Sequence, residues 1–479
     1  MSFLDKIGDK MRGRVLSWLR LAPAPQQTFC IFERTTRETE VIRSQLWYRG
    51  DANELFQFFH QLSGVQGSFW GSVPEDGSVR KVHSGIPAII VDTLAYIVRS
   101  DLDDISAPPE WEELSGRLGF ADIVGSAVVD TLVGGDGAFR VSVDDSGGIG
   151  LDFIGAARCS FEDGDVIIRT EYPEKNRIYT LSERYGSGFV ESRLYDDNGH
   201  EAPLGTVPAL ADIQQYIAFP GGYSMAVPLK FFASKKYPGR GKSIFSGGRS
   251  DCFDSLDEVI SQWWDAIRAG RVKQYIPESM IPRDPRSGSL MAPDQFGNSY
   301  IEVTAPLIEG VDNQHIQTVQ PDISYEAFAS AYANALLMCL QGLVSPATLG
   351  IDVGKMSSAE AQREKKDVTG NTRNTITTAL EKVLPEVINA VLMTTDNLRG
   401  AVPEKRSISV SFGEYGAPDF DSRVETVGRA AAYGVMSVET QVNELWGSSK
   451  GEKWKAEETA RIMAEKGLIE PAVPGFDEE

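Results

Sequence analysis

The sequence predicts an α+β fold, and three observations lead to this class. Apolar side chains recur at helical spacing over residues 51–135 and again after residue 250. Between these parts, residues 137–230 form short alternating or β-branched segments separated by turn signals. The chain has 479 residues with 42% apolar content, which indicates a sizeable core arranged either as two to four domains or as one elongated subunit.

The composition argues against several classes of protein. A formal charge of −21 does not suit tight, nonspecific wrapping of nucleic acid, which requires clustered lysine and arginine. No apolar run reaches the roughly 18 residues of a membrane-spanning helix. Because the cysteines are far apart without a CxxC pair and the histidines are isolated, we expect a reducing cytoplasm, no disulfide framework, no metal site and no cofactor. These residues are Cys30, Cys159, Cys252, Cys339, His60, His83, His200 and His315.

Residues 1–25, MSFLDKIGDKMRGRVLSWLRLAPAP, predict an amphipathic helix with basic residues among its apolar positions. The segment has no uninterrupted apolar region and no cleavage site, so it is not a secretory signal. It could lie on a membrane surface, which would make the protein a membrane-associated scaffold. The commoner alternative is a helix that docks on its own or a neighbouring subunit.

Three helical segments follow. In RGDANELFQFFHQL, Asp51 and Glu54 have the spacing of a capping box ahead of an apolar face. Residues 86–98 predict a buried helix, and residues 111–135 predict either a helix pair or one helix broken near Gly119. From about residue 137 to 230, turn signals such as DDSGG, EDGD and DDNG separate the strands of an antiparallel region.

The stretch KKYPGRGKSIFSGGRSD, residues 235–251, contains part of a nucleotide-binding loop. Its GKS matches the end of a P-loop, whose glycine-rich turn directs backbone N–H groups at phosphates. However, Lys236 replaces the first glycine, no strand leads in, and two glycines follow where a helix should begin. We therefore interpret it as a basic hinge, either solvated or in contact with phosphate or an acidic partner, and keep a P-loop-like NTPase as the disfavoured alternative. The hinge residues are Lys235, Lys236, Arg240 and Lys242.

A second stretch with an enzyme-like pattern is GYSMA, residues 222–226. It approaches the G-x-S-x-G nucleophile elbow but ends in alanine, and no nearby histidine suggests a base. We therefore expect no enzyme activity.

The second half begins with a helix over residues 250–269, whose acidic residues fill its first half and favour its N-terminus. A proline-containing excursion with strands at RVKQYI and SYIEVTA separates it from a helix over residues 322–343. These two helices should lie side by side, because the excursion returns the chain to its start. A loop then leads to a polar helix over residues 357–397, in which Gly370 and Pro385 predict a kink or break. The strand SISVSF, three short helices and an acidic tail complete the chain.

This arrangement resembles the portal (head–tail connector) proteins of tailed bacteriophages, particularly the siphophage type. The resemblance covers about residues 44–412 and depends on four stretches that are specific only in combination. These are WYRGDANELFQFF, GDGAFRVSV, GKSIFSGGRSDCFDSLDEVISQWWDAIRAGRVKQYIPESM and QPDISYEAFASAYANALL. It implies a non-enzymatic homo-oligomeric ring, usually of twelve subunits, at one vertex of the capsid. It also implies a location in the virion after assembly in the bacterial host cytoplasm.

The resemblance implies an elongated portal-type subunit with an α/β wing, a two-helix stem, a small clip and a helical crown. In chain order these are the N-terminal helix (1–25), the wing (26–245), the first stem helix (246–270), the clip (271–322), the second stem helix (323–343), the tunnel loop (344–357), the long wing helix with its returning strand (358–417) and the crown (418–479).

The resemblance also implies partners and site residues. Double-stranded DNA would slide through the channel with weak contacts, since an acidic ring repels phosphate. The terminase large subunit, a head-completion or adaptor protein, the major capsid protein and scaffold would dock outside it. The tunnel loop would present Gly350, Ile351, Asp352, Val353, Gly354, Lys355 and Met356 to the channel. The basic channel candidates at the stem–clip junction are Arg268, Arg271 and Lys273, and the clip docking candidates are Arg283 and Arg286.

Overall fold

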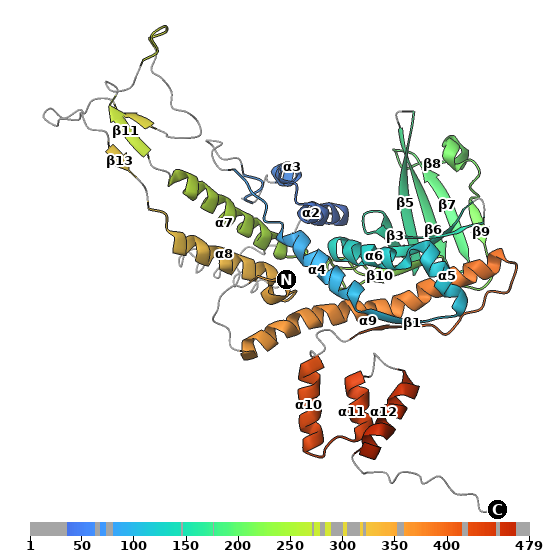
Figure 1. The fold of residues 1–479 in the computed structure, drawn as a ribbon. Helices are drawn as coiled ribbons and strands as arrows, with labels where there is room; N and C mark the ends of the chain where they lie inside the picture. Colours follow the sequence, from blue (N-terminus) through green and yellow to red (C-terminus); the bar gives the residue numbers. More distant parts are fainter. Residues whose placement is uncertain are drawn as a thin grey trace, which may run out of the picture.

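The computed structural model has an α+β architecture, as predicted (Figure 1). It describes residues 36–62, 68–72, 80–144, 147–175, 177–270, 273–277, 283–288, 300–303, 317–319, 322–351, 359–413, 420–446 and 451–465. The predicted amphipathic helix over residues 1–25 lies outside these residues. Among the described helices, none combines the length and the apolar character that a bilayer crossing requires.

The main body is built around six helices that share one large apolar core. They are α2 (Arg37–Arg49), α3 (Ala52–Leu62), α4 (Ile86–Ser100), α5 (Pro109–Leu118), α6 (Phe120–Gly134) and α9 (Ala359–Leu398). The predicted helices over residues 51–62 and 86–98 form, and residues 111–135 form the pair alternative, with Gly119 between α5 and α6 at a φ of 65°. The sequence analysis missed α2, because its sequence is mostly polar and only a few of its side chains are buried.

The predicted antiparallel region forms two sheets beside these helices. The three-stranded sheet has the order β10 (Ala226–Lys230), β2 (Asp136–Val143), β3 (Ile149–Gly155). The larger sheet has the order β4 (Cys159–Glu162), β5 (Asp165–Glu174), β6 (Arg177–Gly186), β7 (Phe189–Tyr195), β8 (Glu201–Ala202), with β9 (Tyr216–Ala218) also paired to β7. Two short 3₁₀ turns, η1 (Leu204–Thr206) and η2 (Pro208–Leu210), lie between β8 and β9. Every pairing in both sheets is antiparallel, and the β5–β6 hairpin stands out from the body in Figure 1.

Helix α9 crosses the whole body as one helix of 40 residues (Figure 1). Of the predicted kink or break at Gly370 or Pro385, the break is therefore wrong. Leu384 and Ile388, on either side of the proline, are fully buried, and burial on this scale outweighs the local cost of a helical proline. After α9 the chain returns as β14 (Ser409–Phe412), the predicted strand, and pairs antiparallel with β1 (Leu102–Ser106), which was not predicted.

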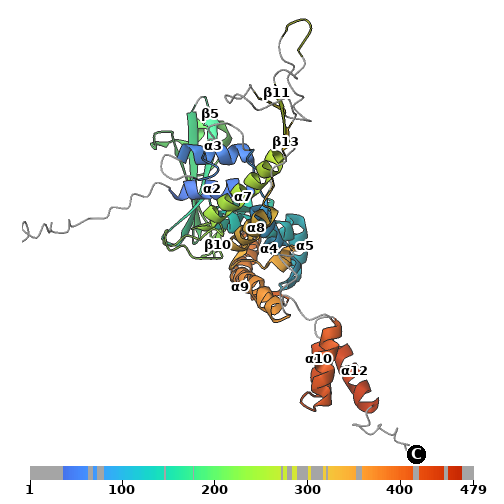
Figure 2. The same cartoon turned by 90° about the vertical axis from the view of Figure 1, so that its left-hand side faces the viewer.

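Two antiparallel helices, α7 (Arg249–Ala269) and α8 (Tyr325–Leu340), extend from the body and carry a small sheet at their far end (Figures 1 and 2). Both helices and their side-by-side arrangement were predicted. In the sheet, β11 (Lys273–Pro277) is central, pairing parallel with β12 (Tyr300–Val303) and antiparallel with β13 (Gln317–Val319). The first two strands correspond to predicted ones, whereas β13 is new.

The C-terminal part contains the three predicted short helices, α10 (Phe420–Ala432), α11 (Val438–Trp446) and α12 (Glu452–Glu465). They pack on one another below α9 in Figure 1. Trp446 at the end of α11 and Trp454 in the first turn of α12 meet edge to face with ring centroids 5.7 Å apart, which connects the two helices.

Candidate functional site

The candidate site is the projecting helix pair together with the sheet that it carries. One aromatic cluster joins α7 and α8 in the half of the helix pair that lies toward the small sheet. Trp263 on α7 stacks on Phe328 of α8 with ring centroids 6.3 Å apart and contacts Tyr325 and Tyr332 at 5.7 and 6.3 Å. Such aromatic contacts fix helices more specifically than aliphatic packing alone, because the rings have preferred relative orientations.

The two ends of the pair are also fixed. At the end toward the small sheet, a Cβ on Gly270 would lie 2.5 Å from Cδ1 of Ile323, so a larger residue here would require the Ile323 side chain to shift. At the end of the pair that joins the body, Arg249 donates to the carbonyl oxygens of Cys339 at 2.8 Å and Gln341 at 3.1 Å. Burial lowers the pKa of Arg249 and raises that of the Cys339 thiol to about 12. The pair is therefore anchored along its length.

A second segment, residues 68–72 and 80–85, runs along a face of α7 that α8 does not cover; we call it the strap. Asp254 on α7 accepts hydrogen bonds from the backbone N–H groups of Phe69 at 2.7 Å and Trp70 at 3.1 Å. Burial raises the pKa of this carboxyl, and the neighbouring carboxylate of Asp257 adds to the effect. Higher on the same face, Ser261 accepts from the N–H of Val82 at 2.9 Å.

Asp257 is the centre of the strap contact. Its side chain is fully buried and accepts from the indole Nε1 of Trp70 at 3.0 Å and the backbone N–H of Ser84 at 2.8 Å. Nδ1 of His83 lies 2.7 Å from Oδ2 of the same carboxylate. A buried carboxylate is stable only with several such partners, so these contacts make Asp257 the anchor of the strap.

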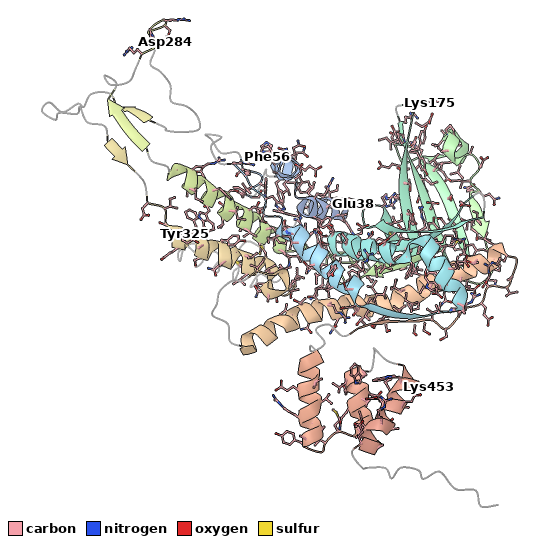
Figure 3. The ribbon with its side chains drawn as sticks, in the orientation of Figure 1. Glu38, Phe56, Lys175, Asp284, Tyr325 and Lys453 are labelled. Carbon is pink, nitrogen blue, oxygen red and sulfur yellow. The ribbon has the colours of Figure 1, made fainter. Side chains whose placement is uncertain are left out.

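Lys81 joins the two parts of the strap, residues 68–72 and 80–85. Its ammonium group donates to the carbonyl oxygens of Phe69, Trp70 and Ser72 at 2.5, 2.9 and 2.6 Å. It also lies 5.2 Å from the ring centroid of Phe56, which is labelled on α3 in Figure 3. Burial lowers the pKa of this amine. The strap thus connects α3 to α7 and holds the helix pair against the body.

The predicted basic hinge packs on the body. Arg240 and Asp136 form a bidentate ion pair with both distances 2.9 Å, and Arg240 also donates to the carbonyl of Cys159. Lys236 pairs with Glu40 at 2.6 Å, whereas the side chains of Lys235 and Lys242 are exposed. These contacts attach the stretch to β2 and α2.

The same contacts contradict the P-loop alternative. The N–H of Gly241 donates to Asp136 at 2.7 Å, and that of Lys242 donates to the carbonyl of Phe232 at 2.7 Å. Ser243 is buried and lies 3.4 Å from the carbonyl of Leu132. The groups that a P-loop directs at phosphate are therefore already bonded within the protein.

The GYSMA stretch is no nucleophile elbow. The hydroxyl of Ser224 donates to the carbonyl of Ala226 at 2.9 Å, and the serine precedes strand β10 instead of joining a strand to a helix. An elbow requires the strand–turn–helix context that exposes the hydroxyl. Within the described part of the chain, no group of His, Cys, Asp and Glu side chains is arranged to hold a metal ion.

The predicted tunnel loop is described only in its first half. Val344 and Ser345 are buried, and a 3₁₀ turn, η4 (Pro346–Leu349), leads to Gly350 at a φ of 68° and then to Ile351. The remaining residues of the prediction lie outside the described residues, namely Asp352, Val353, Gly354, Lys355 and Met356.

The basic candidates near the sheet are only partly described. Arg268 is exposed near the end of α7, Arg271 lies outside the described residues, and Lys273 is described only in its backbone, as the first residue of β11. Arg283 and Arg286 are exposed beside Asp284, which Figure 3 places beyond the small sheet, at the point farthest from the body. Arg283 and Arg286 therefore lie three positions apart in one short stretch, residues 283–288, whereas Arg268 lies apart from them in the last turn of α7.

Sequence reasoning missed the strap and its partners. His83 looked like an isolated polar residue, and the acidic residues of α7 looked like a favourable helix start. The available signal was the spacing of Asp254, Asp257 and Ser261, which puts three polar side chains on one face of a helix that is apolar beside it.

Comparisons with known proteins find structural neighbours and no relatives by sequence. No protein-family model matches the chain. No curated protein matches it. The structural neighbours include chains of gene transfer agent particles.

One such chain comes from the "Neck of native GTA particle computed with C12 symmetry", with 14% identity, a TM-score of 0.38, and 77% of this chain and 96% of that chain covered. Another comes from the "Virion of native gene transfer agent (GTA) particle", with 13% identity, a TM-score of 0.35, and coverage of 94% and 98%. A third comes from the "Neck of empty GTA particle computed with C6 symmetry", with 13% identity, a TM-score of 0.34, and coverage of 86% and 94%. Similarity at TM-scores this low carries no functional argument.

Proposed function

We propose that this chain is the subunit of a phage portal, a ring at one vertex of a capsid. The ring encloses the channel through which double-stranded DNA enters during packaging and leaves during ejection. The finished protein belongs to the virion after assembly in the bacterial host cytoplasm, and it acts as a structural protein.

The observation that carries the proposal is the projecting pair α7–α8 with a separate small sheet at its far end (Figure 1). A stem of two antiparallel helices that presents a clip away from a broad wing is the layout that the portal resemblance implies. The aromatic cluster around Trp263 and the strap anchored on Asp257 stiffen that stem, as a channel wall requires. After the stem, the long helix α9 and the C-terminal helical group follow in the order that the portal layout requires, as the long wing helix and the crown.

The acidic composition suits a channel through which DNA slides. With a formal charge of −21 per chain, an assembled ring would repel phosphates over most of its surface. Contacts to DNA would then be weak and local, which permits movement in both directions.

The partners follow from this placement. The sheet at the tip, with Arg283 and Arg286, would contact the terminase large subunit during packaging and the head-completion or adaptor protein afterwards. The wing would contact the major capsid protein and scaffold. The tip can serve both partners because the motor leaves before the head-completion protein binds, whereas the capsid contacts persist and require a separate surface.

Negative-stain electron microscopy with mass photometry tests the proposal directly. We expect rings with a central hole and a mass near twelve times the 52.4 kDa subunit. A monomer would be examined again after co-expression with the capsid and scaffold proteins, where it should join a ring. A compact dimer or tetramer without a hole would contradict the proposed function.

A further inference from the structure

The strap contacts one face of α7 only in the part of the helix that lies toward the body. Strap residues bind Asp254, Asp257 and Ser261. Beyond Ser261, toward the C-terminal end of α7, the same face continues with Trp264, Asp265 and Arg268. Together with Arg80 and Val82 of the strap and Ile267, these residues line a hollow of about 410 Å³. We call it the α7 hollow.

The α7 hollow is lined by both apolar and cationic side chains. Trp264 is 55% exposed and Ile267 is 44% exposed, and both line the hollow, so they form an exposed apolar surface there. The side chains of Arg80 and Arg268 form no ion pair or hydrogen bond with any of the described residues. Two guanidinium groups against the single carboxylate of Asp265 leave the α7 hollow with a net positive charge.

The complementary feature lies at the N-terminal end of α8 in the same chain. At the N-terminal end of α8, Tyr325 is 65% exposed, and Asp322 and Glu326 are exposed acidic residues. Figure 3 shows Tyr325 at the end of α8 that lies toward the small sheet. The exposed tyrosine with its two carboxylates is opposite in charge to the exposed tryptophan with its two arginines, and the two aromatic side chains are comparable in size.

The two features lie at the same level along the helix pair. Trp263, next to Trp264, contacts Tyr325 with ring centroids 5.7 Å apart. In a closed ring each subunit contacts the next through two different surfaces, at equal heights along the ring axis. If the helix pair lies along that axis, the α7 hollow of one copy and the α8 end of the next copy meet in register.

We propose that the α7 hollow binds the acidic N-terminal end of α8 from a second copy of this chain. This inference rests on the proposed ring and specifies which surfaces form its interface. Trp264 and Tyr325 supply the buried aromatic contact, and Arg80 and Arg268 pair with Asp322 and Glu326 of the neighbouring subunit.

DNA phosphate is the other anion that could enter a hollow with two arginines. The carboxylate of Asp265 and the apolar surface of Trp264 and Ile267 favour a protein partner, because phosphate gains nothing from either. A phosphate site would also leave the exposed acidic end of α8 without a role. The test includes this alternative as an outcome.

A charge exchange between the two surfaces separates these possibilities. One variant carries R80E and R268E, and the other carries D322R and E326R. Alone, each variant would place like charges at every subunit contact, so we expect ring formation to fall at least tenfold by mass photometry. Mixed in equal amounts, the two variants can alternate around the ring with opposite charges at every contact, and rings should return.

The matched control is Arg177→Glu, which makes the same change at an exposed arginine beside the β5–β6 hairpin tip and should leave ring formation unchanged. Circular dichroism confirms that each variant is folded before mixing. Rings formed by either variant alone at wild-type yield would overturn the inference, as would a folded mixture that forms none. So would normal rings of R80E/R268E that have lost salt-dependent binding of duplex DNA, which would assign the α7 hollow to phosphate. Failure of the wild-type chain to form rings, both alone and after co-expression with the capsid and scaffold proteins, would instead contradict the proposed function.

Discussion

Trp70 donates its indole N–H to the carboxylate of Asp257 over 3.0 Å, although 187 positions separate the two residues in the chain. This bond lies in a buried network that also includes His83 and Ser84. The network joins the projecting helix α7 to the strap, and through it to α3 and the body. The position of the candidate channel wall therefore depends on one buried carboxylate.

Asp257→Asn should destabilise the protein by about 3 kcal/mol, because an amide presents an N–H₂ group to a site filled with donors. Urea denaturation measures the loss. Asp251→Asn is the matched control, since Asp251 is an exposed carboxylate in the first turn of the same helix and contributes less than about 1 kcal/mol there. Equal losses in the two variants would contradict the anchoring role of Asp257.

Asp254 gives the strap a defined pH dependence. Burial raises its pKa in the folded protein above the ordinary value of 3.8, so the folded state holds this proton more tightly than the unfolded state does. The resulting stabilisation is complete below the unfolded pKa and is lost as the pH rises through the folded pKa. The cost of Asp254→Asn, measured by urea denaturation from about pH 4 to about pH 8, should therefore fall as the pH rises.

Asp251→Asn removes one negative charge from the same helix and serves as the reference for that series. Subtracting its pH profile cancels the general effect of charge on an acidic protein. A cost of Asp254→Asn that grows with pH would mean that hydrogen bonds from Phe69 and Trp70 outweigh burial at this carboxyl.

The sequence allowed prediction of the α+β class, most helices and the α7–α8 pair, because each depends on local periodicity or on the return of one excursion. The strap could not be predicted. It has no period of its own, and its partners on α7 lie 173 to 187 positions away. The pairing of β1 with β14 escaped prediction for the same reason, since neither short strand indicates its distant partner. The predicted break in α9 failed because buried side chains on both sides of Pro385 outweigh a local preference.

Gly241→Ala tests how closely the basic stretch packs on the body. A Cβ at this position would lie 1.9 Å from the carbonyl oxygen of Gly135, and neither backbone can move without disturbing the Arg240–Asp136 pair. We expect a loss of about 3 kcal/mol or more in the free energy of unfolding, measured by thermal denaturation. Gly205→Ala is the control, because nothing lies within 4 Å of a Cβ there. A mild effect at Gly241 would show that this stretch is looser than its contacts indicate.

Purified protein should show no ATP hydrolysis above background. The N–H groups of Gly241 and Lys242 already donate to Asp136 and to the carbonyl of Phe232, which leaves no cradle for phosphate. A phosphate-release assay on the wild type and on Lys242→Ala checks this expectation. Clear turnover that disappears in the variant would establish a nucleotide site and refute the structural role assigned to the stretch.

Pro385→Ala should stabilise the protein by about 1–3 kcal/mol. Proline inside a helix lacks the N–H that would donate to the carbonyl of Glu381, and α9 nevertheless continues through it. Asn389 donates to the carbonyl of Pro385 at 3.0 Å, a contact that alanine would keep. Thermal and urea denaturation should both show the gain, while the neighbouring exposed change Glu386→Ala should shift stability by less than about 0.5 kcal/mol. A loss of stability in Pro385→Ala would mean that the half-buried ring packs on the core strongly enough to offset the missing hydrogen bond.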